Sequence, residues 1–392
     1  MGALDGVRVA EAGLLVQGPQ AAAMLGDWGA EVVKVELPGI GDQSRWVPLA
    51  PDDPRSAYFS ACNRGKRSMT LDLRTSVGQE AFLRLCEQVD VVITNFAPGT
   101  MEAWGLGYDT VAAHNPRIVY ATGSTFGPEG PDAAQEGADL SAQAAGGLIS
   151  TTGLDGGDLT PVGVTIADHI ASQNLVAGIL AALFARERTG RGQRVDTSLI
   201  GGQIWAQASE YTGYLLTGRI AGRAHRGHPL IPGLYGIFRT ADGWIAVVGV
   251  IGAARALFFD TIGRPELGAR FDQPLYWQAE RSELFPLLDE AFSERTTAAW
   301  CAALREVGLR HAPVRNHAEV VADRGAWING YFAKVRDDAG ERTVVATPVR
   351  FSDTPAVAGA TAPELGQHTE EVLLELGYSW EEIGSMSSEG AV

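Results

Sequence analysis

The sequence contains little cysteine and no excess of positive charge. Its three cysteines, Cys62, Cys86 and Cys301, lie far apart and form no CxxC pair, so we expect neither a zinc site nor a disulfide framework. The formal net charge is −16, whereas a nucleic-acid-binding face needs a basic balance. The charge therefore argues against a nucleic-acid partner, although a small phosphorylated ligand would need only a local basic pocket.

A long apolar run and several familiar motifs are also missing. The longest apolar run, residues 175–185, is well short of the ~20 residues that span a membrane, and the first residues show no secretory signal pattern. We therefore expect a cytoplasmic protein with no membrane partner. No GxGxxG follows the first expected strand, no P-loop or HExxH motif occurs, and the 7 histidines show no metal spacing. The sequence thus predicts neither a dinucleotide site nor a metal site.

Short β-branched segments alternate with helical segments in the first third of the chain. Helices are expected near residues 18–28 and at 76–88, where apolar residues recur on one face. Extended segments are expected at residues 7–10, 31–37, 68–73, 91–94 and 118–122. Strands separated by helices of this length predict βαβ units and a parallel sheet with helices on both faces. We therefore expect an α/β fold.

The middle of the chain changes character. After Asp168, apolar residues at three- and four-residue spacing predict a long helix that ends near Gly190, and a second helix is expected at 200–216. Two strands around the turn at 241–243, followed by two helices, predict a small α+β domain. The expected organisation is a large domain at 1–217, a Gly-, Arg- and Pro-rich linker at 218–232, the small domain at 233–325 and a return to the large domain at 326–392.

Three segments combine residue types that suit chemistry. Asp168 starts the long helix, so its carboxylate either caps the helix by accepting backbone N–H groups or, held ionised there, acts as a nucleophile. The basic stretch 63–74 is either a solvated loop or a phosphate site. Residues 95–99 follow a buried strand and form either an ordinary turn or part of a ligand site at the carboxyl edge of the sheet. The residues alone leave each pair of alternatives open.

Together these segments resemble the class III CoA-transferase family, which includes formyl-CoA transferases, carnitine CoA-transferases and α-methylacyl-CoA racemases. The resemblance runs over nearly the whole chain and is most specific at residues 29–36, 63–74, 95–99 and 179–196. It implies a Rossmann-like large domain with a parallel sheet, a small α+β domain and an interlocked homodimer. It also implies acyl-CoA and a small carboxylic acid as substrates, with no tightly bound cofactor.

The resemblance favours the nucleophile at Asp168. It implies that Asp168 attacks the thioester of an acyl-CoA, so that CoA passes through an aspartyl anhydride and an aspartyl-CoA thioester to the acceptor acid. Gln17 and Asp139 are further catalytic candidates. The residues that the resemblance assigns to CoA binding are Val16, Leu71, Leu73, Arg74, Asn95, Phe96 and Ala97, with Arg74 near a phosphate.

The sequence departs from the family pattern at several positions. A catalytic Gln of some transferases falls on Val16 when aligned without gaps, and Gln17 is one place later. A phosphate-binding Arg of the family is Ala103 here, and the basic residue usual after the second strand is Leu37. The tetraglycine segment of formyl-CoA transferases is missing from residues 227–236, which argues against a formyl and oxalate substrate pair.

The racemases of the family carry a base histidine that this chain lacks. Their Gly-His-Asp segment is Gly137-Ala138-Asp139 here. Racemisation needs two groups on opposite faces of the α-carbon, so the missing histidine favours a transferase, and Asp139 remains as an acid/base candidate. We therefore predict a CoA-transferase, with an α-methylacyl-CoA racemase or epimerase and an inactive CoA-binding protein as the alternatives.

Overall fold

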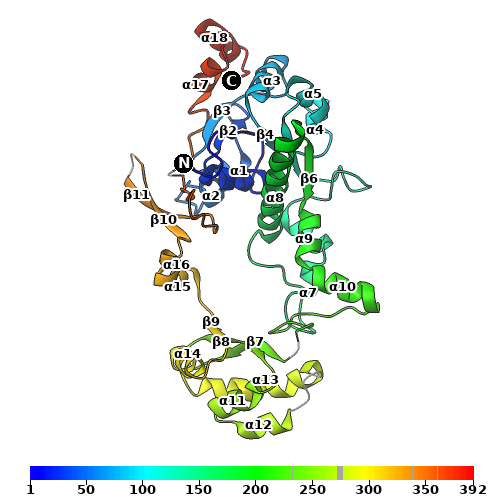
Figure 1. Ribbon diagram of the computed structural model, residues 1–392, viewed down its shortest axis with the longest axis vertical. Coiled ribbons are helices and arrows are strands. Elements are labelled where there is room, and N and C mark those ends of the chain that lie inside the picture. Colours follow the sequence, from blue (N-terminus) through cyan, green and yellow to red (C-terminus); the bar gives the residue numbers. More distant parts are fainter. Residues whose placement is uncertain (232, 272–276, 338–339, 360) are drawn as a thin grey trace. The chain divides into compact units, whose positions relative to one another are not determined.

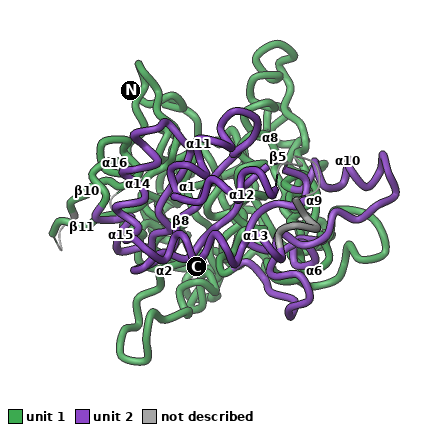
Figure 2. The backbone as a smooth tube through the Cα atoms, turned by 90° about the horizontal axis from the view of Figure 1, so that it is seen from below, with its two compact units in different colours: residues 1–146, 163–206, 323–392 green, residues 147–162, 207–322 purple. Residues whose placement is uncertain are grey.

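The structure is a computed structural model that describes residues 1–231, 233–271, 277–337, 340–359 and 361–392. Its contacts divide the chain into two compact units (Figure 2). Unit 1 comprises residues 1–146, 163–206 and 323–392, and unit 2 comprises residues 147–162 and 207–322. Unit 2 thus includes residues 147–162 and 207–217, which the sequence-based ranges place in the large domain. Pro232, the last residue of the expected linker, lies outside the described residues.

Unit 1 is built on a six-stranded parallel sheet (Figure 1). In spatial order the strands are β3 (Arg67–Thr70), β2 (Glu31–Glu36), β1 (Arg8–Glu11), β4 (Val91–Thr94), β5 (Val119–Ser124) and β6 (Arg194–Ser198). The predicted α/β class and parallel sheet are confirmed. Because the order reverses between β1 and β4, the carboxyl ends of these two strands form the point where open parallel sheets usually bind ligands.

Helices cover both faces of this sheet because successive strand residues point to opposite sides. On one face, α1 (Gln17–Asp27) and the long α8 (Ile166–Thr189) pack on apolar residues such as Val9 and Val91. The other face packs on α3 (Ser76–Gln88), α17 (Thr369–Glu375) and α18 (Trp380–Ser388). The C-terminal helices therefore complete the core of unit 1.

The helix α8 is the one helix of the described residues that is long and apolar enough, by composition alone, to cross a membrane. In this fold it packs against α1, against the strands β5 and β6, and against α9 (Leu199–Ala206). The expected single helix at 200–216 is wrong in one respect, because the chain breaks at the buried Gln207 into α9 and α10 (Ala208–Thr217).

Shorter elements complete unit 1. They are the 3₁₀ helix at Gln43–Trp46, α2 (Ala57–Asn63), α4 (Thr100–Ala103), α5 (Tyr108–His114), α6 (Asp139–Ala145), α16 (Arg324–Ile328) and the antiparallel pair β10 (Phe332–Asp337) and β11 (Gly340–Val345). The sequence did not predict this pair of strands, since their residues are mostly polar.

Unit 2 contains a small antiparallel sheet covered by helices. The strands β7 (Leu234–Arg239) and β8 (Trp244–Val250) form the predicted hairpin, and β9 (His311–Pro313) pairs with β8. The helices are α7 (Leu148–Thr151), α10, α11 (Ala254–Thr261), α12 (Pro265–Arg270), α13 (Trp277–Ser293), α14 (Thr297–Glu306) and α15 (His317–Val321). Phenylalanines of β7, α11 and α13 form much of its core.

Candidate active site

Asp168 is the third residue of α8 and does not cap it. The N-cap residue is Thr165, whose side chain makes no capping hydrogen bond. The cap comes from α6, where Oδ1 of Asp139 accepts the N–H of Ala167 at 2.7 Å and the N–H of Asp168 at 3.2 Å. The interpretation of the Asp168 carboxylate as the helix cap is therefore wrong, because Asp139 occupies that role.

The Asp168 carboxylate is half-buried and unpaired. No hydrogen bond to either of its oxygens is found among the described residues. Burial, together with the nearby charge of Asp139, raises the pKa of Asp168 to about 7, because both effects disfavour the charged form. The expectation that helix amides hold this carboxylate ionised is also wrong. A carboxylate with open lone pairs and a pKa near neutrality is suited to nucleophilic attack.

Asp139 is fully engaged with the protein. It is 9% exposed, and its Oδ2 accepts a hydrogen bond from Nε2 of Gln143 at 2.6 Å. The same Gln143 nitrogen lies 3.3 Å from the carbonyl oxygen of Val164, just before α8. These contacts fasten Asp139 to the first turn of α8, so an acid/base role would require it to release one of them.

A single hydroxyl links the start of α1 to the turn that carries Asp168. Oγ of Ser172 lies 2.8 Å from the carbonyl oxygen of Gln17 and 2.7 Å from that of Asp168. Next to it, Nδ1 of His169 lies 2.6 Å from Oε1 of Gln20 on α1, and burial lowers the pKa of His169. The first turns of α1 and α8 are therefore held side by side.

Gln17 is buried beside this link. Its side chain is 3% exposed, and its Nε2 has no hydrogen-bond partner among the described residues. The amide packs over Gly123 of β5 so closely that a Cβ on that glycine would lie 2.3 Å from Oε1 of Gln17. A buried N–H donor without a partner can stabilise a developing oxyanion. Of the sequence candidates, Gln17 and Asp168 are thus connected through adjoining helix turns.

Val16 and Asn95 both lie at the point where the strand order reverses. Asn95 directly follows β4, and its Nδ2 donates to the carbonyl of Leu14 at 2.8 Å while its Oδ1 accepts the N–H of Leu14 at 2.7 Å. Leu14 lies in the loop after β1, and Val16, which is 4% exposed, ends that loop. Asn95 therefore links the loop after β1 to the carboxyl end of β4 through two hydrogen bonds.

The structure does not bring all seven predicted CoA-binding residues together. Leu71 and Leu73 are 1% and 6% exposed and pack in the core, so only their backbone could meet a ligand. The Arg74 side chain is 60% exposed and pairs with Asp72 at 2.7 Å. Asp72 accepts from Nε and Nη2 of Arg74, so Nη1 is left on the exposed side chain for a phosphate group.

The basic stretch at 63–74 does not form a free positive surface. Its cations have carboxylate partners: Arg64 with Asp27, Lys66 with Glu11, Arg67 with Glu31, Glu371 and Glu375, and Arg74 with Asp72. Lys66 is buried at 4% exposure. Within this stretch, the interpretation as a phosphate site therefore depends on the exposed Arg74.

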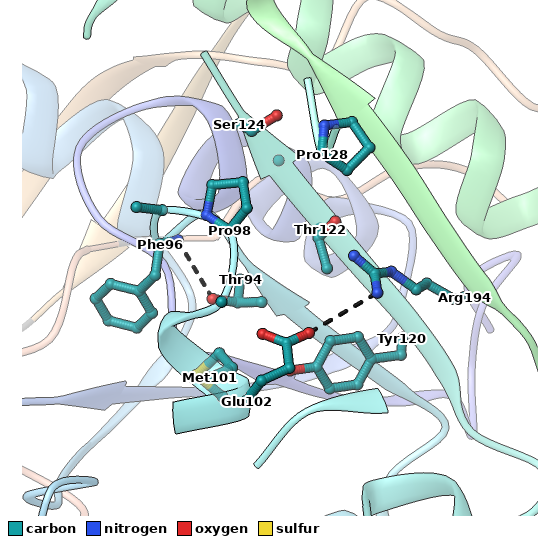
Figure 3. A pocket seen from close by; sticks show the side chains of 13 residues that line it. Thr94, Phe96, Pro98, Met101, Glu102, Tyr120, Thr122, Ser124, Pro128 and Arg194 are labelled. Atoms are coloured by element: carbon teal, nitrogen blue, oxygen red, sulfur yellow. Dashed lines mark hydrogen bonds and ion pairs between the residues drawn. The ribbon is translucent and has the colours of Figure 1, made fainter. Parts of the chain in front are cut away.

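Phe96 and Ala97 line a separate, small pocket at the carboxyl ends of β4 and β5 (Figure 3). Across the pocket, Arg194 of β6 lies 3.8 Å from Glu102 and 2.8 Å from Asp196, so its charge is compensated. The lining residues include none of the three catalytic candidates. Among the described residues, no group of three or more His, Cys, Asp or Glu side chains is arranged to hold a metal ion.

Comparisons with known proteins identify the family of this chain. Residues 4–369 match the profile of CoA-transferase family III. The chain is 35% identical to the succinyl-CoA:mesaconate CoA-transferase of Haloarcula marismortui, over 96% of this chain and 97% of that protein. It is 31% identical to the succinyl-CoA:glutarate CoA-transferase of Homo sapiens, over 99% and 90%. A crystal structure of a CaiB/BaiF family protein from Brucella suis matches with a TM-score of 0.84 and 32% identity, over 96% and 99%. The chain therefore belongs to CoA-transferase family III and is an enzyme that transfers CoA between an acyl-CoA and a carboxylic acid.

Proposed function

We propose that this transferase takes CoA from succinyl-CoA, or the CoA ester of a similar dicarboxylic acid, and passes it to a second carboxylic acid through covalent intermediates on Asp168. The unpaired, half-buried carboxylate of Asp168 carries the proposal. The choice of donor is supported by the relatives, several of which are named as succinyl-CoA-dependent transferases. The acceptor is a small carboxylic acid of unassigned structure.

The first half of the reaction releases the donor acid. A carboxylate oxygen of Asp168 attacks the thioester carbonyl carbon, the C–S bond breaks, and a mixed anhydride forms with release of CoA thiolate. The thiolate then attacks the Asp168 carbonyl carbon, and the bond between this carbon and the bridging oxygen of the anhydride breaks, so that the oxygen leaves with the donor acid. Succinate leaves, and an aspartyl-CoA thioester remains.

The second half is the reverse with a new acid. The acceptor carboxylate attacks the aspartyl thioester, expels CoA thiolate and forms a second anhydride. Thiolate attacks the acceptor acyl carbon, which gives the new acyl-CoA and restores the Asp168 carboxylate. No electrons or protons are consumed overall, so the reaction needs no redox group.

The chain's own residues support these steps. The Nε2 group of Gln17 donates to the oxyanion that forms at each attack, where a preorganised donor has the greatest effect. Val16 and Asn95, at the edge between β1 and β4, contact the CoA moiety. Arg74, which also pairs with Asp72, binds a phosphate group of CoA. Asp139 keeps the first turn of α8 in place.

Chemical trapping tests the proposal. Incubation with succinyl-CoA and hydroxylamine, followed by peptide mass spectrometry, should convert Asp168 to a hydroxamate. Asp168→Asn should abolish turnover, whereas Asp109→Asn, at an exposed position in the first turn of α5, should not. Turnover without any label on Asp168 would falsify the proposal. Deuterium uptake at the α-carbon without an acceptor acid would instead point to a racemase.

We also propose that two copies of the chain form an interlocked homodimer that binds no cofactor tightly. The dimer is supported by large apolar side chains left open to solvent, such as Trp205, Leu215, Leu216 and Ile220, which are 74–83% exposed. Monomers rarely expose so much apolar surface without a partner.

A further inference from the structure

Side chains from elsewhere in unit 1 hold the centre of the loop between β1 and α1. The N–H of Gly13 donates to Oε1 of Glu11 at 2.7 Å, and the Gly13 carbonyl accepts from Nζ of Lys34 at 3.0 Å. The N–H of Leu15 donates to Oδ1 of Asp42 at 3.0 Å. Together with the contacts of Asn95 to Leu14 described above, these bonds hold Gly13, Leu14 and Leu15 in place.

Two buried lysines join the acidic side chains that hold the loop. Nζ of Lys34 lies 2.9 Å from Asp42 and 3.2 Å from Glu11, and all three side chains are fully buried. Glu11 and Lys34 are opposite each other in the β1–β2 register, so the sheet itself places this pair. Nζ of Lys66 lies 2.9 Å from Oε2 of Glu11 and 2.8 Å from the carbonyl oxygen of Pro19 in α1.

A buried charge network is a poor way to stabilise a fold. Removing ions from water opposes folding, and replacing such a network with apolar residues is often neutral or stabilising. The loop also contains Leu15 at φ 63°, a left-handed conformation that a leucine keeps only where its surroundings impose it. What the network does in this structure is bond the loop at Gly13 and Leu15.

The fixed loop determines where α1 begins. Gln17 is the first residue of α1, and its buried Nε2 has no partner among the described residues. Ser172 links the Gln17 carbonyl to the turn that carries Asp168. A change in the loop would thus move the Gln17 amide relative to the Asp168 carboxylate.

We propose that Lys34 and Lys66 are positioning residues for CoA transfer, which act through this loop to keep Gln17 in register with Asp168. The inference rests on the proposed function, because it takes the same two side chains as the reacting site. Both lysines are buried and are saturated with protein partners, so they touch neither substrate. Their loss should slow the covalent steps and leave acyl-CoA binding almost unchanged.

The test compares Lys34→Met with Arg186→Met. Arg186 is a matched control because it is 7% exposed, pairs with Asp90 at 3.0 Å and donates to the carbonyl of Arg117 at 3.2 Å. It lies near the C-terminal end of α8, far along the helix from Asp168. We expect both variants to lose thermal stability, whereas only Lys34→Met loses kcat, by about 10–100-fold. Its KM for succinyl-CoA should stay within about threefold of the wild type.

Equal losses of kcat in Lys34→Met and Arg186→Met would overturn the inference, because the lysine would then act on stability alone. If Lys34→Met does not fold, Leu15→Gly decides the question. Glycine adopts this backbone conformation without strain, so the fold should be retained while the loop becomes less constrained. A kcat reduced by about tenfold at unchanged Tm supports the inference, and an unchanged kcat refutes it.

Asp168→Asn is measured alongside these variants. If it turns over like the wild type, the proposed function fails, whatever the loop variants show. If Asp168 is essential but Lys34→Met and Leu15→Gly match the control, only the positioning role fails.

Discussion

Oδ1 of Asp139 lies 3.2 Å from the backbone nitrogen of Asp168, so one carboxylate anchors the residue whose side chain it also repels. The anchoring is a hydrogen bond from the backbone N–H, whereas the repulsion acts between two side-chain charges. Because the two effects act through different atoms of Asp168, they can be separated by substitution.

The rate of acylation should follow the ionisation of Asp168. Since the attacking form is the carboxylate and the pKa of Asp168 is raised to about 7, kcat/KM for succinyl-CoA should rise about tenfold per pH unit below that value and level off above it. A pH profile between pH 5 and 9 measures this. A midpoint near the ordinary aspartate value would contradict the assignment.

Asp139→Asn should shift that midpoint to lower pH. The amide oxygen of the new asparagine can still accept the N–H groups of α8. The neighbouring negative charge is gone, however, so the ionised form of Asp168 is less disfavoured and its pKa falls. His169 is the other titratable group beside it, and its pKa is lowered, so it is neutral over most of the range. An unchanged midpoint in Asp139→Asn would show that burial alone sets the pKa.

Asp168→Asn should stabilise the protein above neutral pH. The pKa of this carboxyl is higher in the folded state than in the unfolded state, so folding binds a proton and stability falls as pH rises from about 4 to about 7. Removing the group should recover roughly 1–4 kcal/mol of unfolding free energy at pH 8 and almost nothing at pH 4. Urea unfolding at both pH values measures the difference, and a destabilised variant at pH 8 would refute the prediction.

Gly123→Ala should impair catalysis through Gln17. The new methyl group would lie 2.3 Å from Oε1 of Gln17 and must displace the amide, with an expected loss in kcat of about 10–100-fold. Gly26→Ala is the matched control. Gly26 also lies in unit 1, in α1, and its new methyl group would meet only a methyl group of Val32, at an ordinary contact distance of 3.5 Å. The kinetics of the two variants are compared once their Tm values are shown to be equal, so that a difference in kcat reports on the Gln17 amide. Equal kcat values would show that Gln17 has no part in catalysis.

The proposed homodimer should have twice the 41.5 kDa mass of the chain. Light scattering after size exclusion measures this directly. Because interlocked subunits separate only on unfolding, the mass should not change over a wide dilution range. A monomer at micromolar concentration would exclude the interlocked arrangement.

The fold was predictable where strands are buried on both sides. Almost all side chains of the segments Glu31–Glu36 and Val91–Thr94 are buried, and both segments were identified as strands. The edge strand β6, from Arg194 to Ser198, was missed because its residues are polar and partly exposed. The other edge strand, β3, was predicted because two of its residues are buried, so the lack of an apolar pattern, and not the edge position itself, hides β6 in the sequence.

The sequence offered candidate residues for the site but could not show their contacts. Asp168 and Gln17 were identified mainly through the family resemblance, and their roles stay predictions, as does a cytoplasmic location. No local pattern could show that the cap of α8 comes from Asp139, because a cap is normally sought within a few residues of the helix start. Likewise, the partner of Lys34 depends on the register of two strands and not on sequence spacing.

Between Asp139 and Asp168 the chain leaves unit 1 after residue 146 and returns at residue 163. The Gln143 amide contacts both the Asp139 side chain and the Val164 carbonyl, so the points of departure and return are tied together inside unit 1. Residues 147–162 can therefore lengthen, shorten or change composition while the distance from Asp139 to Asp168 stays the same. The architecture leaves this segment free to diversify during evolution without altering the reaction that the two carboxylates support.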